Sequence, residues 1–525
     1  RDYYASRGLG DVYKRQIKKW LGYYPVFWII ISCVYAVVFI TIDFSGNPIS
    51  SVKGFFILAS QWSIVALCSA GVIGLIGAWR LIFAITFPIL ILCSTILSYF
   101  RLTMGIGLTP MTIELAIVNN MATWATVISW KLIVVAIIAT IISLPPVIWR
   151  WRYVDPHKPL DYATLSILII ALPIGIIPRI KPAVMARMPY VFYSSVAQHL
   201  DNHQHITQHR DTFDKVPVSI TVPTDSIDVI VVIGESLRSD HLQLNGYSRS
   251  TTPRLAKERN LITIPEMYTE PYFTHTSVPR ILTRADAENP DCAYEEQSFI
   301  TLFRKVGYYT LWLSNQDMST SYAYFMHEAD SLIYVNSGKS FYDYDRWMDI
   351  DMLPHFNRKA LKHKLNLIVI HSIGSHWWYD AHYNTEYAPF HPTADSRIVS
   401  ELSREQMINS YDNTIVETDR FLSELIDTIR GRNAILIFIS DHGEALGENG
   451  AYLHGEDYPE LHNPAAFVWW SDKYEHHYPH IIDALRTNFS GPHTTDEIFH
   501  SVLDAGQIQT PVHNPKKSFL NHEKD

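Results

Sequence analysis

The sequence predicts a multi-domain protein in which a bundle of five transmembrane helices precedes an α/β domain with a mostly parallel sheet flanked by helices. Two observations predict this fold class. The first third of the 525 residues consists of long apolar runs, whereas the rest alternates short apolar runs with helical stretches. A chain of this length also exceeds what one hydrophobic core holds. We therefore expect a membrane domain at 17–182, a linker at 183–225 and a second domain at 226–525.

The first sixteen residues are set apart from this fold. They contain no Met, and residues 11–16 (DVYKRQ) look like a translated adapter from library preparation. We interpret 1–16 as a sequencing artefact, with a natural basic leader as the alternative. Nothing about function is inferred from them.

Five segments are apolar over the roughly 20 residues that a helix needs to cross the hydrocarbon core of a bilayer. They are residues 24–42, 55–79, 81–100, 131–149 and 161–178. Basic residues lie before the first segment and in the links after the second and fourth: Lys18, Lys19, Arg80, Arg150, Arg152 and Lys158. The positive-inside rule puts these ends in the cytoplasm. An odd number of spans then puts the second domain on the opposite face, which in a bacterium is the periplasm.

The stretch between the third and fourth spans has a different pattern. Residues 111–129 (MTIELAIVNNMATWATVIS) are apolar but interrupted by polar side chains, which predicts an interfacial helix on the outer face. Its polar groups could contact a lipid headgroup, and simple packing at the interface is the alternative. Pro145 and Pro146 lie in the fourth span and could kink it, and membrane helices tolerate such prolines.

Three apolar runs of the second domain end in loops that carry functional side chains. The runs are 228–234 (DVIVVIG), 365–371 (LNLIVIH) and 434–440 (AILIFIS). The side chains that follow them are Glu235 after the first, His371 and His376 at the second, and Asp441, His442 and Glu444 after the third. Ligands bind beyond the carboxyl ends of the strands in open α/β sheets, so we expect these loops to converge. For any single Asp or Glu, a helix N-cap is the alternative.

These side chains suit a metal. Glu235, Asp441 and His442 supply two carboxylates and one imidazole, and with one position left open this is the ligand pattern of catalytic zinc. A hydroxyl nucleophile activated by zinc would complete the site. The loop at 273–282 (FTHTSVPRIL) contains three hydroxyls, Thr274, Thr276 and Ser277. The residues alone do not choose among them, and an ordinary turn is the alternative.

Charge and cysteine content exclude two other kinds of site. The net charge of −9 provides no broad basic surface for nucleic acid. Cys33, Cys68 and Cys93 lie in apolar runs, so Cys292 is the only cysteine of the second domain. That domain forms no internal disulfide and no zinc site of the CxxC type.

Three motifs carry a resemblance to a known family. They are SDHGEALGENGAYLHGE at 440–456, VVIGES at 231–236 and LNGYSRSTTPRL at 244–255. From Val229 onward the chain resembles the phosphoethanolamine transferases of bacterial envelopes, within the alkaline phosphatase and sulfatase superfamily. That group includes lipopolysaccharide-modifying enzymes and the mobile enzymes of colistin (polymyxin) resistance. With the five apolar segments, the resemblance covers nearly the whole chain.

The resemblance implies a set of site residues. A Glu after the first strand, a Thr three residues before SVP and the DH pair bind zinc in the family, and they match Glu235, Thr274, Asp441 and His442. Thr274 is thereby implied as the nucleophile. Two His of the family lie near the phosphoryl group and match His376 and His454, as substrate-binding or catalytic groups or as ligands of a second zinc ion. Weaker candidates for substrate binding are Glu444, Asn119 and Thr123.

The chain also departs from the family. Relatives that modify lipid A usually carry SVPC and several disulfides, whereas Arg280 follows Pro279 here and Cys292 stands alone. With few cysteines and with SNQ at 314–316, the chain resembles members of the family that act on core sugars or periplasmic glucans. Four positions after Thr123 the family pattern has an acidic residue, whereas this chain has Val127.

The resemblance implies transfer of phosphoethanolamine from phosphatidylethanolamine to an envelope glycolipid or glycan, through a phosphothreonine. We expect one or two zinc ions, a monomer, and residence in the bacterial inner membrane with a cytoplasmic N-terminus. The alternatives are a phosphoglycerol transferase or a hydrolase (phosphodiesterase or sulfatase) of the same superfamily, and a degenerate membrane protein without activity. The sulfatase signature, Cys or Ser-x-Pro-x-Arg, is one residue longer than Ser277–Arg280.

Overall fold

The computed structural model of the chain forms two compact units. It describes residues 21–44, 51–104, 107–110, 112–113, 130–154, 158–177, 180–206, 210–220, 226–316, 320–336, 346–396, 399–454 and 457–524. One unit contains residues 1–199 and 338–343, and the other contains 200–337 and 344–525. Residues 1–16, most of the predicted interfacial helix, Asn119 and Thr123 lie outside the described residues, so what was expected of them stays a prediction.

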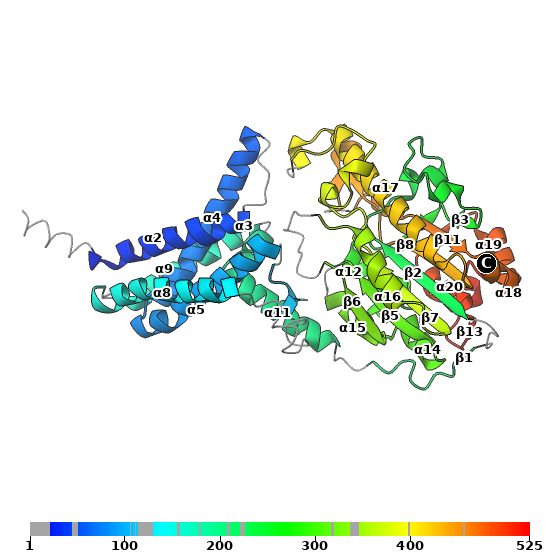
Figure 1. Cartoon of the computed structure of the whole chain (residues 1–525), viewed down its shortest axis with the longest axis horizontal. Helices are drawn as coiled ribbons and strands as arrows, with labels where there is room; N and C mark the ends of the chain where they lie inside the picture. The colour runs from blue at the N-terminus through cyan, green and yellow to red at the C-terminus, as the bar shows by residue number, and fades with distance from the viewer. Residues whose placement is uncertain are drawn as a thin grey trace, which may run out of the picture. The chain divides into compact units, whose positions relative to one another are not determined.

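The first unit is built from long apolar helices (Figure 1). They are α2 (Tyr24–Tyr35), continued by a π-helix at Ala36–Ile40 and by α3 (Thr41–Phe44), then α4 (Val52–Gly77), α5 (Arg80–Met104), α8 (Trp130–Arg152) and α9 (Pro159–Ile176). Within the described ranges, five helices are long and apolar enough to cross a membrane. Two short helices follow, α10 (Lys181–Met185) and α11 (Tyr190–Ile206). The predicted five-helix bundle is confirmed.

Small residues on α4 let its neighbours come close. Gly71, Gly74 and Gly77 recur every third residue, and a side chain at any of them would collide with α2 or α9. The Tyr24 hydroxyl donates to the Gly74 carbonyl at 2.7 Å, and the Trp28 indole donates to the Ala70 carbonyl at 2.6 Å. Close backbone approach and hydrogen bonds of this kind hold helices together where no hydrophobic effect drives their association.

Arg150 closes the end of the bundle at which α4 and α8 finish. Its side chain is buried, and its three guanidinium nitrogens donate to the carbonyls of Gly77, Ala78 and Val154 at 2.7–3.1 Å. A cation that binds the last carbonyls of a helix satisfies acceptors that have no partner within the helix. The buried charge is therefore compensated by backbone.

The second unit contains a seven-stranded sheet in the order β3-β11-β8-β2-β7-β5-β6. The strands are β2 (Ile227–Gly234), β3 (Leu261–Thr263), β5 (Tyr309–Ser314), β6 (Ser331–Tyr334), β7 (Leu365–His371), β8 (Ala434–Ser440) and β11 (Ala466–Trp470). The five strands from β8 to β6 are parallel, and β11 and β3 extend the sheet antiparallel. The predicted mostly parallel sheet is confirmed, and its three central strands match the apolar runs.

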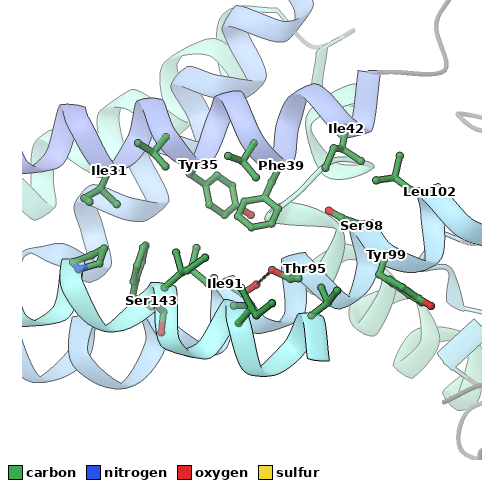
Figure 2. A pocket seen from close by; sticks show the side chains of 18 residues that line it. Ile31, Tyr35, Phe39, Ile42, Ile91, Thr95, Ser98, Tyr99, Leu102 and Ser143 are labelled. Atoms are coloured by element: carbon green, nitrogen blue, oxygen red, sulfur yellow. Dashed lines mark hydrogen bonds between the residues drawn. The ribbon is translucent and has the colours of Figure 1, made fainter. Parts of the chain in front are cut away.

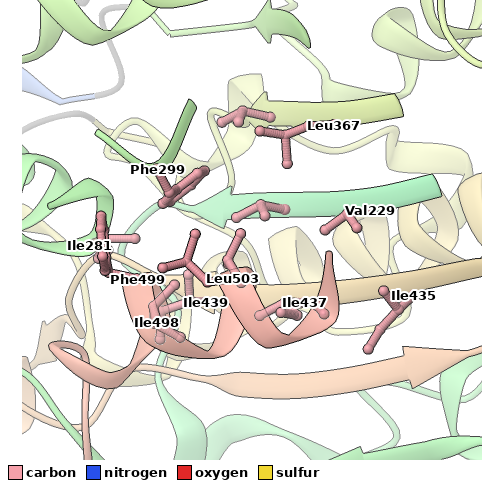
Figure 3. Close-up of a cluster of buried hydrophobic side chains, with 14 of the residues drawn as sticks. Val229, Ile281, Phe299, Leu367, Ile435, Ile437, Ile439, Ile498, Phe499 and Leu503 are labelled. Atoms are coloured by element: carbon pink, nitrogen blue, oxygen red, sulfur yellow. The ribbon is translucent and has the colours of Figure 1, made fainter. Parts of the chain in front are cut away.

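Helices cover both faces of this sheet (Figure 1). One core joins the sheet to α12 (Thr274–Leu282), α14 (Phe299–Lys305), α15 (Thr320–Glu328), α19 (Pro479–Asn488) and α20 (Glu497–Ala505), and part of it is drawn in Figure 3. The other core contains α16 (Leu353–Lys359) and the long α17 (Arg404–Ile429). Along β2, Val229, Val231 and Ile233 belong to the first core and Ile230 and Val232 to the second. The central strand is thus held from both sides.

A matched pair of glycines tests the packing of α4. Gly74→Ala puts a methyl group into the Trp28 ring, whereas a side chain at Gly175 of α9 meets no atom within 4 Å. We expect Gly74→Ala to destabilise the protein by about 1–3 kcal/mol through overpacking, and Gly175→Ala to leave stability unchanged or slightly raised. Thermal unfolding of the detergent-solubilised chain measures both. Equal melting temperatures of the two variants would contradict the packing described.

Candidate metal centre and active site

The centre of the site is formed by the ends of two neighbouring parallel strands. Gly234 of β2 pairs with Ser440 of β8, so the residues that follow, Glu235 and Asp441, emerge side by side. The Asp441 amide donates to the Gly234 carbonyl at 3.1 Å, which continues the pairing one step beyond the strands. The sheet therefore fixes the two carboxylates next to each other.

His442 completes a group of three potential ligands. One ligand atom from each of Glu235, Asp441 and His442 lies within 4.8 Å of the others. His442 Nε2 is 3.6 Å from Glu235 Oε1 and 3.5 Å from Asp441 Oδ2. All three residues are at most 1% exposed. The predicted ligands thus converge in a closed space.

This space is unfavourable for uncompensated charge. Burial, reinforced by the charge of Glu235, raises the pKa of Asp441 to about 7. Burial also raises the pKa of Glu235 and lowers that of His442. Two adjacent carboxylates away from water need a counter-charge to remain ionised together.

Hydrogen bonds orient the group toward a cation. His442 Nδ1 lies 2.7 Å from the Gly443 carbonyl, so this nitrogen carries the proton and the Nε2 lone pair faces the carboxylates. Asp441 Oδ1 accepts from the amides of Ser236 and His442, while Oδ2 accepts no hydrogen bond in the described structure. An unprotonated imidazole, a vacant carboxylate oxygen and Glu235 are donors that suit Zn²⁺.

Thr274 is the hydroxyl that reaches this group. It is the first residue of α12, and its Oγ1 donates to Glu235 Oε2 at 2.9 Å and lies 3.4 Å from His442 Nε2. The other two candidates bond to backbone: Thr276 to the Phe273 carbonyl and Ser277 to the Pro271 carbonyl. Of the three hydroxyls that the residues alone left open, that of Thr274 is therefore the one that lies at the group.

Gln316 is a site residue that sequence reasoning missed. It lies two residues after β5, is 2% exposed, and donates from Nε2 to Glu235 Oε2 at 2.8 Å. Ser236 holds the other oxygen, since its Oγ donates to Glu235 Oε1 at 2.7 Å. Both oxygens of this carboxylate are therefore oriented. The signal was an amide at the end of a fourth apolar run.

His454 and His376 flank the group. The His454 ring lies 4.8 Å from the ring of His442 and 6.3 Å from that of His376, between centroids. Its Nδ1 is 3.1 Å from Glu444 Oε1. Burial opposes protonation of His454, but Glu444, Glu235 and Asp441 outweigh it and raise its pKa to about 9. Loss of hydration, followed by the charge of His454, lowers the pKa of His376 well below its usual value.

One side chain expected among the converging loops lies elsewhere. His371 was expected among the converging loops, but its ring packs edge-on against Trp312 and Tyr322. Its position in β7 faces the core of Leu367 and Val369, because alternate strand residues share a face. Arg280, the residue after Pro279, forms an ion pair with Glu270. Glu444 is in the site as the partner of His454.

We compared the chain with models of known protein families. The sulfatase family model matches residues 227–508, more than half of the chain. The chain belongs to the sulfatase family. The match begins at β2 and covers Thr274 and every candidate ligand.

The individual relatives show which proteins of known name the chain resembles. The chain is 31% identical over 264 residues to the Kdo(2)-lipid A phosphoethanolamine 7''-transferase of Escherichia coli, a match that covers 48% of this chain and 45% of that protein. It spans about half the length of the curated relatives it matches. The resemblance to phosphoethanolamine transferases inferred from the sequence is thereby confirmed.

Solved structures share the fold. The integral membrane lipooligosaccharide phosphoethanolamine transferase A (EptA) of Neisseria meningitidis matches with a TM-score of 0.53 at 20% identity, over 94% of this chain and 98% of that one. The C-terminal periplasmic domain of EcEptC from Escherichia coli, in complex with Zn, matches with a TM-score of 0.54 at 23% identity, over 59% and 90%. At these identities the likeness concerns the fold alone.

The role of Gln316 can be tested through metal affinity. Gln316→Leu removes the amide that orients Glu235, and we expect the Zn²⁺ affinity of the purified chain to fall by about 10–100-fold, as for other groups that orient a ligand. The control is Gln509→Leu, a change at an exposed strand residue. Competition with a fluorescent chelator measures both. An unchanged affinity in Gln316→Leu would refute an orienting role.

Proposed function

We propose that the chain is a zinc-dependent phosphoethanolamine transferase that uses Thr274 as its nucleophile. The donor would be phosphatidylethanolamine and the product a modified envelope glycolipid or glycan. Three findings support this: membership of the sulfatase family, relatives named as phosphoethanolamine transferases, and a buried cluster with the donor atoms that zinc prefers.

The position of Thr274 is the observation that carries the proposal. Its hydroxyl is within hydrogen-bond distance of Glu235, a candidate metal ligand, and stands at the first residue of the nine-residue helix α12. The positive end of a helix favours the negative charge of a phosphoryl group. A hydroxyl in this place is therefore surrounded by what phosphoryl transfer needs.

Glu235, Asp441 and His442 would hold zinc, together with the Thr274 oxygen. When bound, zinc supplies a Lewis acid that lowers the pKa of a hydroxyl and neutralises charge on the transferred group. Glu235, hydrogen-bonded to Thr274, orients that hydroxyl toward the phosphorus. A second zinc ion near His376 and His454 stays an alternative role for those two residues.

The first half of the reaction transfers phosphoethanolamine to the protein. The Thr274 hydroxyl first loses its proton to water, and its oxygen then attacks the phosphorus of phosphatidylethanolamine while the bond from phosphorus to the diacylglycerol oxygen breaks. His454, whose raised pKa keeps it protonated at neutral pH, donates a proton to that leaving oxygen. His376 would bind a phosphoryl oxygen. The products are diacylglycerol and phosphoethanolamine-threonine.

The second half restores the protein. An acceptor hydroxyl or phosphate attacks the same phosphorus from the side that diacylglycerol has left, and the bond to Thr274 breaks. The acceptor's proton returns to the neutral His454. In-line displacement with charge-stabilising groups supplies most of the catalysis in phosphoryl transfer.

The acceptor is proposed as a class only. Arg280 in place of the cysteine found in lipid A modifiers, and a second domain with the single cysteine Cys292, favour a core sugar or a periplasmic glucan over lipid A. The curated relative from Escherichia coli carries Kdo(2)-lipid A in its name, which keeps a lipopolysaccharide acceptor among the candidates. The phosphoglycerol transferase and hydrolase alternatives share the same site chemistry.

The proposed location is the bacterial inner membrane. Arg80, Arg150 and Lys158 gather at the ends of spans that the positive-inside rule assigns to the cytoplasm, and the catalytic unit would then lie in the periplasm as a monomer. Glu444 is proposed as the group that keeps His454 protonated. Asn119 and Thr123 stay proposed donor contacts.

Replacement of the nucleophile tests the mechanism. Thr274→Ala should abolish both lipid turnover and the phosphoethanolamine adduct on the protein. Thr276→Ala, two residues along the chain and hydrogen-bonded to the Phe273 carbonyl, should retain activity. Mass spectrometry of the intact protein and of released diacylglycerol measures both variants. Retained turnover in Thr274→Ala would overturn the assignment, and consumption of phosphatidylglycerol instead would favour the phosphoglycerol alternative.

Metal removal gives a separate test. Without a cation, Glu235 and Asp441 repel each other in a buried site, so exhaustive chelation should lower the melting temperature of the chain as well as its activity. Adding Zn²⁺ should restore both, and Mg²⁺, which prefers an oxygen-rich octahedral site, should not. The control is Asp441→Asn, in which chelation should leave the melting temperature almost unchanged. An equal loss in that variant would contradict the proposed ligand set.

A further inference from the structure

The membrane unit contains a cavity between three of its helices. It has a volume of about 510 Å³ and is bounded by the first span, α5 and α8 (Figure 2). Apolar side chains line it almost throughout, among them Ile31, Phe39, Ile91, Leu102, Ile142 and Pro146. Its volume is within the range of about 300–1,000 Å³ typical of ligand pockets. The catalytic residues belong to the other unit and take no part in it.

Irregular helices keep this space open. The first span changes to a π-helix at Ala36–Ile40, and Val38 and Phe39 of this segment face the cavity. Pro146 of α8 lines the opposite wall, and a proline inside a helix removes a hydrogen bond and bends the helix. π-Helical turns occur frequently at functional sites. Helix irregularities thus lie on two sides of the cavity.

One polar group in the wall lacks a partner. Ser98 of α5 lines the cavity, is 5% exposed, and its hydroxyl forms no hydrogen bond in the described part of the chain. Other hydroxyls of the wall differ: Thr95 donates to the Ile91 carbonyl and Ser143 to the Thr140 carbonyl, both at 2.7 Å. Because an unpaired hydroxyl in an apolar medium is unfavourable, rotation of the Ser98 side chain would turn its now buried oxygen toward an acceptor in the cavity.

The depth of Ser98 indicates what kind of acceptor this is. Three residues farther along α5, Arg101 pairs with Asp43 at 3.7 Å, so charged groups begin about one helical turn beyond Ser98. The lining of α5 extends in the other direction to Phe87, eleven residues and about 16 Å from Ser98. Half of a hydrocarbon core is about 15 Å thick. The α5 lining from Ser98 to Phe87 therefore spans about the depth of one leaflet, and Tyr99 and Leu102 continue the wall beyond Ser98.

We propose that this cavity binds one acyl chain of a diacyl glycerophospholipid from the surrounding membrane. The ester carbonyl at the head of the chain accepts a hydrogen bond from the Ser98 hydroxyl, and the methylene chain extends past Ile91 toward Phe87. The carbonyl is the polar atom that a phospholipid carries at the boundary between its headgroup and its apolar chains. The cavity and Ser98 thus match the two parts of one chemical group.

Photo-crosslinking tests the location. The full-length Thr274→Ala chain, which should not consume the probe, is reconstituted into nanodiscs that contain phosphatidylethanolamine with a diazirine in one acyl chain. We expect adducts on cavity-lining peptides of α5 and α8. Ala139→Phe fills the cavity and should lower these adducts by about tenfold or more, whereas Ile141→Phe, on the exposed side of the same helix, should not.

Equal labelling of Ala139→Phe and Ile141→Phe, or adducts spread evenly over the lipid-facing surface, would overturn the proposal. Phosphatidylglycerol with the same photoreactive chain should label the cavity equally, because the headgroup lies outside it. Labelling by phosphatidylethanolamine alone would contradict a site defined by the acyl chain.

An ether lipid tests the hydrogen bond. Dialkyl phosphatidylethanolamine lacks the ester carbonyl and should compete several-fold less well than the diacyl lipid for the wild-type cavity. Ser98→Ala should remove this preference while the cavity still binds an acyl chain. A wild-type protein that binds ester and ether lipids equally would refute the role of Ser98. None of these readouts depends on transferase activity, so they are separable from the test of Thr274.

Discussion

The parallel pairing of β2 with β8 is the constraint on which the rest of the second unit depends. It forces Glu235 and Asp441 out of the sheet at the same level, into a space that is closed to water. Two buried carboxylates at such proximity are destabilising unless a cation and hydrogen bonds compensate them. The neighbouring loops supply these hydrogen bonds, since Ser236, Thr274 and Gln316 all donate to one or the other acid.

The same constraint explains the tight backbone around the site. Gly374 has a φ of +49°, and a side chain there would collide with the backbone of Glu235. Asp349 accepts hydrogen bonds from the amides of Ile373 and Gly374, which fixes the loop that leads to His376. The loop after β7 can therefore lie against the loop after β2, and both keep their side chains directed at one point.

Much of this arrangement follows from local sequence patterns, and the remainder depends on relations that no local pattern contains. The apolar runs ending at Gly234, His371 and Ser440 predicted the strands, because buried parallel strands are nearly continuous in apolar residues. The side chains at the ends of these strands predicted the group of three potential metal ligands. Gln316 was missed because its role depends on the strand order, in which β5 lies beyond β7. His371 was misassigned although alternation along β7 places it with Val369 in the core. Thr274 needed the start of α12, which no capping side chain marks.

The single cysteine of the second unit has a consequence for how this unit folds. Cys292 is unpaired, and the remaining cysteines lie in membrane helices, so the fold of this unit is held by its two cores and by ion pairs such as that of Arg280 with Glu270. A domain that depends on disulfides has to encounter an oxidant before it reaches its full stability. A domain without such crosslinks reaches its native state by packing alone. The folding of this unit is therefore independent of the redox potential around it.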